Sequence, residues 1–258
     1  MAASSSPAAP SRAVLVTGCS SGIGKTTALH LRAQGYKVYA TARRVASLDE
    51  LARSGCVPLA LDVEDEASMV AAVRAVEAQD GAVGVLVNNA GFSQSGAVEA
   101  VPLAKVRKQF ETNVFGLVRL TQLVLPAMRA QRWGRVVNVS SMGGRLVFPG
   151  GGFYHATKYA VEALSDALRF EVRGFGVRVV LVEPGLIRSG FSEAAVAAME
   201  GTGETAQTYA AFHEAVARAT KESYEKGSLA KLGGEPEDVA RVIAKAIAAK
   251  NPRARYTV

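Results

Sequence analysis

Short runs of β-branched and other apolar residues alternate with longer amphipathic segments along most of the chain. The apolar runs predict strands, and the segments in which apolar positions recur every three or four residues predict helices. The predicted strands are 13–17, 37–41, 57–61, 83–87, 135–139 and 177–182, with a last strand at 254–258. The predicted helices are 23–33, 66–78, 103–130, 154–173 and 235–250, and Pro126 is expected to kink or shorten the third.

This alternation predicts an α/β fold, namely a single-domain Rossmann-type doubly wound parallel sheet with helices on both faces. A chain of 258 residues with 49% hydrophobic content can bury one large core. Residues 1–12 are small and polar, which predicts a disordered tail before one catalytic domain at 13–258. Residues 186–232 contain helix formers and glycines without a strand pattern, and such a long insertion is predicted to be a substrate-binding loop or lid.

Composition narrows the function classes. The longest apolar runs have the length of strands, so no membrane span is expected, and the first residues lack the features of a signal peptide. The two cysteines have no metal-ligand spacing, which predicts no metal site and reduced thiols in the cytoplasm. The net charge of +7 comes from scattered Lys and Arg without interleaved aromatic residues, so no nucleic-acid partner is expected.

The main candidate chemistry lies at Tyr154 and Lys158. Residues four apart share one face of a helix, so the ammonium can lie beside the phenol and favour its ionised form. This spacing is common by chance, and a half-buried tyrosine beside a solvated lysine is the simpler interpretation of the pair alone. The interpretation of this pair changes because other sequence motifs occur before and after it in a characteristic order. These elements are the glycine pattern Gly18, Gly22 and Gly24, the run Asn88-Asn89-Ala90-Gly91, then Asn113 and Ser141, with Pro184-Gly185 after the pair.

In this combination the chain resembles the classical short-chain dehydrogenases/reductases, from about Arg12 to the C-terminus. The resemblance implies hydride transfer between a nicotinamide cofactor and a carbonyl or secondary alcohol. It implies that Tyr154 exchanges a proton with the substrate oxygen while Ser141 holds that oxygen. Lys158 would bind the nicotinamide ribose and favour the tyrosinate. Asn113 would kink its helix and position a water for a proton relay.

Glycines at the turn from the first strand to the first helix let the backbone approach a pyrophosphate at the helix N-terminus. A competing interpretation takes Gly24-Lys25-Thr26 as part of a triphosphate loop, but that motif requires glycine at position 19, which is Cys19. Asp62 could contact the adenine or equally cap a turn. The predicted cofactor contacts are Gly18, Ser20, Ser21, Gly22, Ile23, Gly24, Arg43, Asp62, Val63, Asn89, Ala90, Gly91, Tyr154, Lys158, Pro184, Gly185, Ile187 and Ser189.

The end of the second strand bears on cofactor choice. An acidic residue there would bind the adenosine ribose hydroxyls, but the family alignment implied by the resemblance places Ala42 at this position, followed by Arg43 and Arg44. Guanidinium groups bind a 2′-phosphate, so NADP(H) is expected to be favoured over NAD(H). The alternative is that both arginines belong to a solvated turn.

The substrate is less defined. Apolar residues at 146–149 and Phe191 suggest a lipophilic ketone or aldehyde, and local sequence style resembles hydroxysteroid and retinol dehydrogenase-like members. His155 is interpreted as a packing or surface residue, and Ser140 is the alternative to Ser141 as the serine that holds the substrate oxygen.

The alternative functions are a non-catalytic dinucleotide-binding sensor and an NAD-dependent dehydrogenase of a small polar alcohol. An extended epimerase would require a second domain. The family resemblance implies a homodimer or homotetramer formed through helices 103–130 and 154–173.

Overall fold

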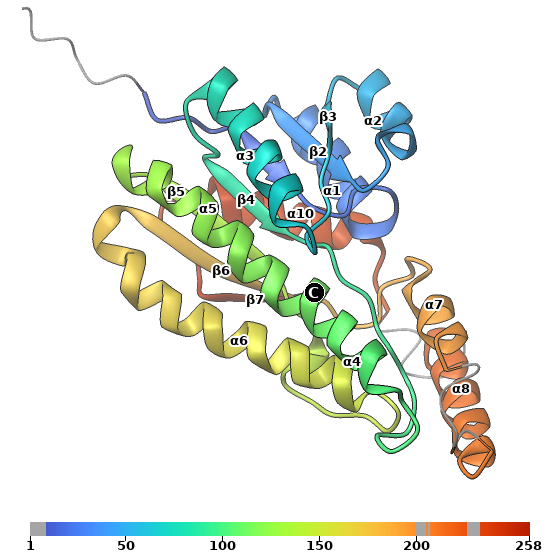
Figure 1. Ribbon diagram of the computed structural model, residues 1–258. Coiled ribbons are helices and arrows are strands. Elements are labelled where there is room, and N and C mark those ends of the chain that lie inside the picture. The colour runs from blue at the N-terminus through green and yellow to red at the C-terminus, as the bar shows by residue number, and fades with distance from the viewer. Residues whose placement is uncertain (1–8, 200–204, 206, 226–232) are drawn as a thin grey trace, which may run out of the picture.

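The computed structural model describes residues 9–199, 205, 207–225 and 233–258. One parallel sheet of seven strands has the order β3-β2-β1-β4-β5-β6-β7 (Figure 1). Its strands are β1 Val14–Val16, β2 Val38–Ala42, β3 Val57–Ala60, β4 Val85–Asn88, β5 Gly134–Val139, β6 Val177–Glu183 and β7 Arg255–Thr257. The strand order reverses between β1 and β4, and the loops at the carboxyl ends of these two strands therefore border a crevice in which such sheets bind ligands.

Helices cover both faces of the sheet (Figure 1). Helices α1 (Gly22–Ala33) and α10 (Pro236–Ala248) pack on one face, and α3 (Glu66–Asp80), α5 (Gly116–Ala130) and α6 (Gly152–Val172) pack on the other. Successive residues of β1 enter opposite cores: Val14 and Val16 join the first, and Leu15 joins the second. This double burial explains why the strands are continuous apolar runs rather than alternating ones. The predicted doubly wound α/β fold is confirmed.

The predicted helix at 103–130 is interrupted at a different place from the one expected. It comprises α4 (Leu103–Phe110), a π-helical turn at Glu111–Phe115, and α5, which continues past Pro126 to Ala130. The expectation that Pro126 shortens this helix is therefore wrong. The interruption surrounds Asn113, whose side chain bonds to the backbone of Phe92 on a neighbouring loop. A π turn adds a residue to the helix and lets that side chain leave the regular register.

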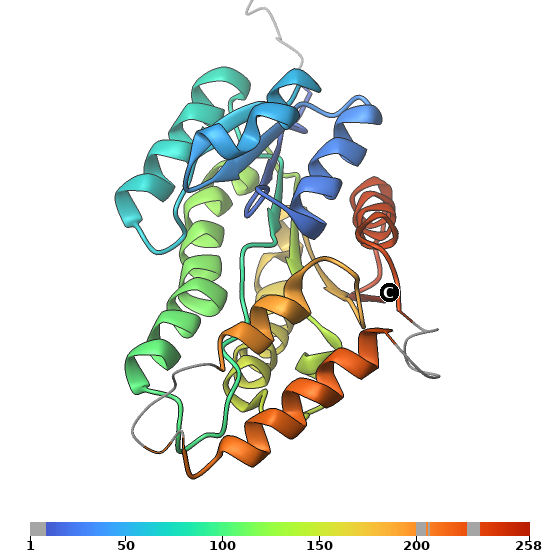
Figure 2. The same cartoon turned by 90° about the vertical axis from the view of Figure 1, so that its right-hand side faces the viewer.

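The insertion at 186–232 contains two helices, α7 (Phe191–Ala197) and α8 (Ala210–Glu225), which pack against each other (Figure 2). Three hydrogen bonds connect this region to the loop after β4: Gln94 Nε2 donates to Ala198 O at 2.7 Å, Ala97 N to His213 Nε2 at 3.0 Å, and Tyr209 OH to Glu99. Residues 200–204, 206 and 226–232 of the predicted lid lie outside the described residues.

The N-terminal prediction needs one correction. Residues 1–8 lie outside the described part of the chain, but Ser11 Oγ donates to Ala82 O at 2.7 Å and Arg12 stacks over the ring of Trp133. These contacts fix Ser11 and Arg12 on the domain, so a tail extending to residue 12 is too long. A short helix, α2 (Asp49–Arg53), was not predicted either. None of the helices in the described ranges is long and apolar enough to cross a membrane.

Candidate active site

Four predicted catalytic residues meet at the carboxyl edge of the sheet. Ser141 lies just beyond β5, and α6 contributes Tyr154 and Lys158 from successive turns. Ser141 lies close enough to the Tyr154 phenol to lower its pKa, and Lys158 Nζ lies 5.7 Å from the centroid of the Tyr154 ring. Asn113 reaches α6 through a 3.1 Å hydrogen bond from Nδ2 to Thr157 Oγ1. The fold therefore assembles side chains that are far apart in the sequence.

Burial controls the electrostatics of Tyr154. Desolvation raises the pKa of its phenol to about 12, and the hydrogen bond with Ser141 opposes this rise. Lys158 lies over the aromatic ring, and its ammonium donates to Val139 O at 2.9 Å. The protein groups by themselves therefore favour the neutral phenol, which is the form that can donate a proton.

Lys158 is almost fully buried. Desolvation lowers the pKa of its ammonium to about 8, and the negative charge of Glu162, one turn further along α6, raises it. The ammonium has three N–H groups, and Val139 O accepts one of them. Two N–H groups remain for ligand hydroxyls.

The side chain of Asn113 fixes a loop. Its Oδ1 accepts from Phe92 N at 3.0 Å, and its Nδ2 donates to Phe92 O at 2.9 Å as well as to Thr157. The loop also passes close to this side chain at Gly91, where a Cβ would make a tight contact of 3.1 Å with Asn113 Oδ1. Asn113 thus clamps the loop after β4 to α6. Its predicted role in holding a water remains a prediction.

The two competing serines differ in their surroundings. Ser141 accepts from Gly143 N at 3.0 Å and bonds to Tyr154, whereas Ser140 is buried and its Oγ has no hydrogen-bond partner among the described residues. Ser141 is therefore the serine that contacts the phenol.

His155 is a packing residue, as predicted. It is buried, its Nδ1 bonds to Gly143 O at 3.1 Å, and its Nε2 accepts from Phe148 N at 3.2 Å. The sequence did not reveal that it holds the loop between these residues. The glycines near His155 could have indicated this close packing. A Cβ on Gly143 would lie 2.4 Å from the imidazole, and a Cβ on Gly151 would lie 2.5 Å from it.

The glycine turn has the geometry of a pyrophosphate site. Gly18 and Gly22 have φ angles of 71° and 53°, in the left-handed region, and a Cβ on Gly24 would lie 2.3 Å from Gly18 O. Ser21 precedes α1 but makes no side-chain capping bond, and the first turn contains no acidic residue. The backbone amides at this N-terminus are therefore unpaired by any cap, and they fit a phosphate group. Ser20 and Ser21 are exposed here, and Ile23 is half-buried.

Other predicted cofactor residues border the same turn. Asn89 Nδ2 donates to Thr17 O at 2.9 Å, and Ala90 N donates to Thr17 Oγ1 at 2.9 Å, so the loops after β1 and β4 are joined. Ser189 lies against Gly22, since a Cβ built there would be 3.4 Å from its side chain. The loop after β6 is thereby brought to the glycine turn. Its remaining predicted residues are buried Pro184 and Ile187 and half-buried Gly185.

The loop after β3, which contains the predicted cofactor residues Asp62 and Val63, makes structural contacts within the protein. Asp62 Oδ1 accepts from Glu64 N at 3.0 Å, which is the turn-capping alternative, while an adenine contact stays a prediction. Val63 is buried against Gly116, where a Cβ would lie 2.3 Å from Val63 O.

A buried polar network beneath the site was missed. Asn88 Nδ2 donates to Asn138 Oδ1 at 2.9 Å and to Thr121 Oγ1 at 3.1 Å, and Asn138 Nδ2 donates to Ser165 Oγ at 2.9 Å. The network connects β4, β5, α5 and α6 below the catalytic residues. Asparagines inside two apolar strands were the sequence signal.

The residues that bear on cofactor choice lie at the end of β2. Ala42 is its last residue, and Arg43 is exposed, with no hydrogen bond or ion pair to any described residue. Lys25 forms an ion pair with Glu50 at 2.7 Å. It is therefore engaged on the surface, which removes the support for a triphosphate loop.

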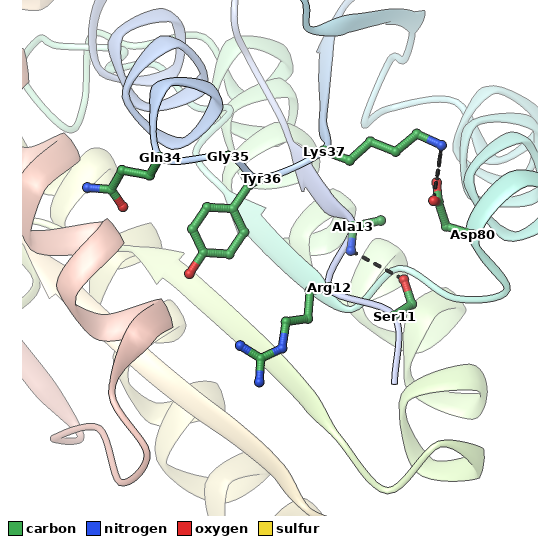
Figure 3. Close-up of a pocket in the computed structure, with 8 residues that line it drawn as sticks. All are labelled: Ser11, Arg12, Ala13, Gln34, Gly35, Tyr36, Lys37 and Asp80. Atoms are coloured by element: carbon green, nitrogen blue, oxygen red, sulfur yellow. Dashed lines mark hydrogen bonds and ion pairs between the residues drawn. The ribbon is translucent and has the colours of Figure 1, made fainter. Parts of the chain in front are cut away.

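A hollow of about 490 Å³ lies at the amino ends of the strands, opposite the carboxyl edge that carries Tyr154 (Figure 3). Arg12 and Tyr36 line it from segments before β1 and β2, and Lys37 pairs with Asp80 beside it at 2.9 Å. These segments lie at the amino ends of the strands, so this hollow is separate from the catalytic residues.

Apolar side chains border the catalytic tyrosine. The Phe191 ring lies 5.5 Å from the Tyr154 ring, centroid to centroid, and Leu146, Val147 and Phe148 are exposed. These three residues therefore lie on the surface and not in the core.

Known proteins share this sequence and fold. The sequence profile described as short chain dehydrogenase matches residues 12–200. The chain is 37% identical over 245 residues to a 3-ketodihydrosphingosine reductase of Bacteroides thetaiotaomicron, covering 95% of this chain and 87% of that protein. It is 38% identical over 260 residues to estradiol 17-beta-dehydrogenase 1 of Rattus norvegicus, covering 95% and 73% of the two chains.

Among solved structures, the closed form of a serine dehydrogenase complexed with NADP+ superposes with a TM-score of 0.81 at 28% identity, covering 95% of this chain and 94% of that one. Sequence profile, relatives and solved structure agree with the geometry of the tyrosine, serine, lysine and glycine turn. The chain therefore belongs to the short-chain dehydrogenase/reductase family and is an oxidoreductase that uses NAD(P) to act on CH–OH groups.

Proposed function

We propose that this enzyme transfers a hydride between NADP(H) and a lipophilic ketone, aldehyde or secondary alcohol, with Tyr154 as its acid and base. The observation that carries this proposal is that the cluster of Ser141, Tyr154 and Lys158 and the uncapped N-terminus of α1 lie at the same carboxyl edge of the sheet. The reduced cofactor supplies the hydride and, once oxidised, a positive charge. All proton handling falls to residues of the chain.

In carbonyl reduction, Tyr154 donates its phenolic proton to the oxygen that becomes an alkoxide, and its own O–H bond breaks as the alcohol O–H forms. Ser141 donates a hydrogen bond to the same oxygen and stabilises the developing charge. Lys158 holds the ribose hydroxyls with its two remaining N–H groups, and its charge stabilises the tyrosinate left behind. Asn113 keeps the loop after β4 in place and is proposed to hold a relay water.

The preference for NADP(H) is supported by the absence of an acid at Ala42 and by the exposed, unpaired guanidinium of Arg43. A 2′-phosphate would form charge-assisted hydrogen bonds with this group. The NADP+ complex of the serine dehydrogenase has the same fold and adds support.

A lipophilic substrate is supported by Phe191, whose ring contacts Tyr154, and by the exposed apolar residues Leu146, Val147 and Phe148, the last of which contacts His155 beside Tyr154. Two relatives are named for lipid substrates, one a 3-ketodihydrosphingosine reductase and one an estradiol dehydrogenase. We propose that α7 and α8 form the lid over this surface.

The test is NADPH oxidation, followed by absorbance, against long-chain 3-ketones, steroid ketones, small polar ketones and aldehydes. We expect turnover with the first two classes, and Tyr154→Phe should lower kcat at least about a hundredfold while NADPH affinity stays the same. Serine oxidation with NAD+ as the best reaction would instead support the polar-alcohol alternative. Wild-type turnover by the Tyr154→Phe variant would refute the role of the tyrosine.

We further propose a homo-oligomer that assembles through α5 and α6, in the cytoplasm. Phe115 precedes α5 and Phe170 lies on α6, and both are exposed, Phe170 to 78%. Contiguous exposed apolar patches mark association surfaces, and we propose that these two residues belong to one. Phe170→Glu should convert the oligomer to a monomer in light scattering, whereas the same change at exposed Val45, away from these helices, should not. Both cysteines are buried free thiols, which supports a reducing compartment.

A further inference from the structure

Two buried glutamates lie directly behind the catalytic lysine. Glu162 is one turn beyond Lys158 on α6, and Glu183 is the last residue of β6. They are only 6% and 4% exposed. Carboxylates are rarely buried this deeply unless partners satisfy their charge. The proposed catalytic roles do not use either residue.

Each glutamate has one oxygen without a hydrogen-bond donor. Glu162 Oε1 and Glu183 Oε1 are both buried without a donor among the described residues, and so is Ser140 Oγ close by. A Cβ on Gly144 would lie 2.8 Å from that Ser140 oxygen and 3.0 Å from Glu162 Cγ, so Gly144 leaves room for this group. Two carboxylates cannot donate to each other, but a carboxylic acid can donate to a carboxylate.

The surrounding charges distinguish the two carboxyls. Arg255 of β7 donates from Nε to Glu162 Oε2 at 2.9 Å and from Nη2 to Asp166 Oδ2 at 2.6 Å. Toward Glu183 it makes only an ion-pair contact, at 3.2 Å, and exposed Arg145 lies 3.7 Å away. Asp166 also pairs with Arg169.

Glu183 is therefore the better proton carrier of the two. Burial raises the pKa of Glu183 most, the charge of Glu162 raises it further, and the two arginines lower it. A proton on Glu183 could be donated to the Glu162 carboxylate, and this interaction also raises the pKa of Glu183. Arg255 donates a hydrogen bond to Glu162 and none to Glu183.

The charge of Glu162 acts on Lys158. Residues four apart on a helix are neighbours. Burial lowers the pKa of Lys158, the charge of Glu162 raises it, and the two together leave it at about 8. The charged groups around the two glutamates are Lys158 and Asp166 on α6, Arg255 on β7 and Arg145 after the turn at Met142–Gly144.

We propose that Glu162 and Glu183 share one proton, and that ionised Glu162, oriented by Arg255 from the C-terminal strand, keeps the buried Lys158 ammonium charged during turnover. Glu162 is thus a positioning residue that acts through Lys158. The inference rests on the role of Lys158 in the proposed function, and it is independent of cofactor preference and of the substrate.

The test measures the titration of Lys158 directly. The enzyme is labelled with [ε-13C]lysine, and the Lys158 resonance is assigned by its loss in Lys158→Arg. Glu162→Gln should lower the midpoint by about one pH unit or more, because a neighbouring opposite charge is removed. Glu183→Gln should leave it within about 0.3 unit, because glutamine resembles a protonated glutamate. Asp166→Asn is the matched control: it removes a carboxylate bound to Arg255 one turn further from Lys158, and should also leave the midpoint unchanged.

Two further measurements keep the inference falsifiable if Glu162→Gln does not fold. The infrared band of a protonated carboxyl should be present in the wild type at neutral pH and absent from Glu183→Gln. The high-pH limb of kcat should move down with Glu162→Gln by the same amount as the lysine midpoint. An absent infrared band, an equal lysine shift in Glu162→Gln and Glu183→Gln, or no shift in Glu162→Gln would overturn it. A lysine shift in an enzyme without ketone turnover would contradict the proposed function only.

Discussion

The most discriminating perturbation of the cofactor site is Arg43→Ala, with Arg44→Ala as its matched control. Both side chains are exposed beyond β2, and Arg43 has no hydrogen bond or ion pair to a described residue, so its removal should not change the free energy of unfolding. A hydrogen bond to a charged group contributes about 1.5 to 3 kcal/mol. At about 1.4 kcal/mol per tenfold change, loss of the phosphate contact should lower kcat/KM with NADPH by about 10- to 150-fold.

The assay compares kcat/KM for NADPH and for NADH in the wild type and both variants, with the same ketone. In Arg43→Ala we expect the value for NADH to stay the same, because NADH has no 2′-phosphate to lose. Arg44→Ala should change the NADPH value less than Arg43→Ala does. Rising salt should weaken the NADPH preference of the wild type, since it screens an exposed charge pair. A wild type that uses both cofactors equally, or equal losses in the two variants, would show that both arginines belong to a solvated turn.

Two other predictions follow from the site. Gly24→Ala should raise the Kd for NADPH at least about tenfold in a fluorescence titration, because its Cβ would lie 2.3 Å from Gly18 O and displace the turn. Gly35→Ala is the control: its Cβ meets no atom within 4 Å, but Gly35 has a positive φ. This control should therefore lower the free energy of unfolding and leave the Kd for NADPH unchanged. Lys158→Met should remove a pH effect on unfolding. With a pKa lowered to about 8 in the fold, Lys158 disfavours folding below that pH, so the wild type should gain stability relative to the variant between pH 8 and 10.5. A constant difference across this range would contradict the burial of a charged lysine.

Several elements were predictable because they depend on local order. Strands buried on both faces need continuous apolar residues, so β1 to β6 are visible as runs such as Val177–Glu183. The glycine turn is visible because the left-handed angles of Gly18 and Gly22 restrict those positions to residues without a Cβ. The four-residue spacing of Tyr154 and Lys158 gives them one helix face wherever that helix lies.

Other features depend on contacts between distant segments. The break in the helix at 103–130 lies at Asn113 and not at Pro126, because Asn113 bonds to Phe92 from another loop. The pairing of Ser141 with Tyr154 depends on the register between β5 and α6. The lowered pKa of Lys158 could not be predicted from the sequence either, because Lys158 becomes buried only once α6 packs on the sheet.

The sequence by itself determined the fold class and the family and nominated the candidate reacting side chains, because periodicity, glycine positions and helix spacing act over a few residues. Only the tertiary structure decided which groups surround the reacting ones. Glu183 from β6 and Arg255 from β7 lie beside Glu162 because β6 and β7 are adjacent strands and α6 packs against β6. Electrostatic interactions in a buried site depend on distance and desolvation, and both are set by packing between segments that the sequence separates by up to 97 residues, from Lys158 to Arg255.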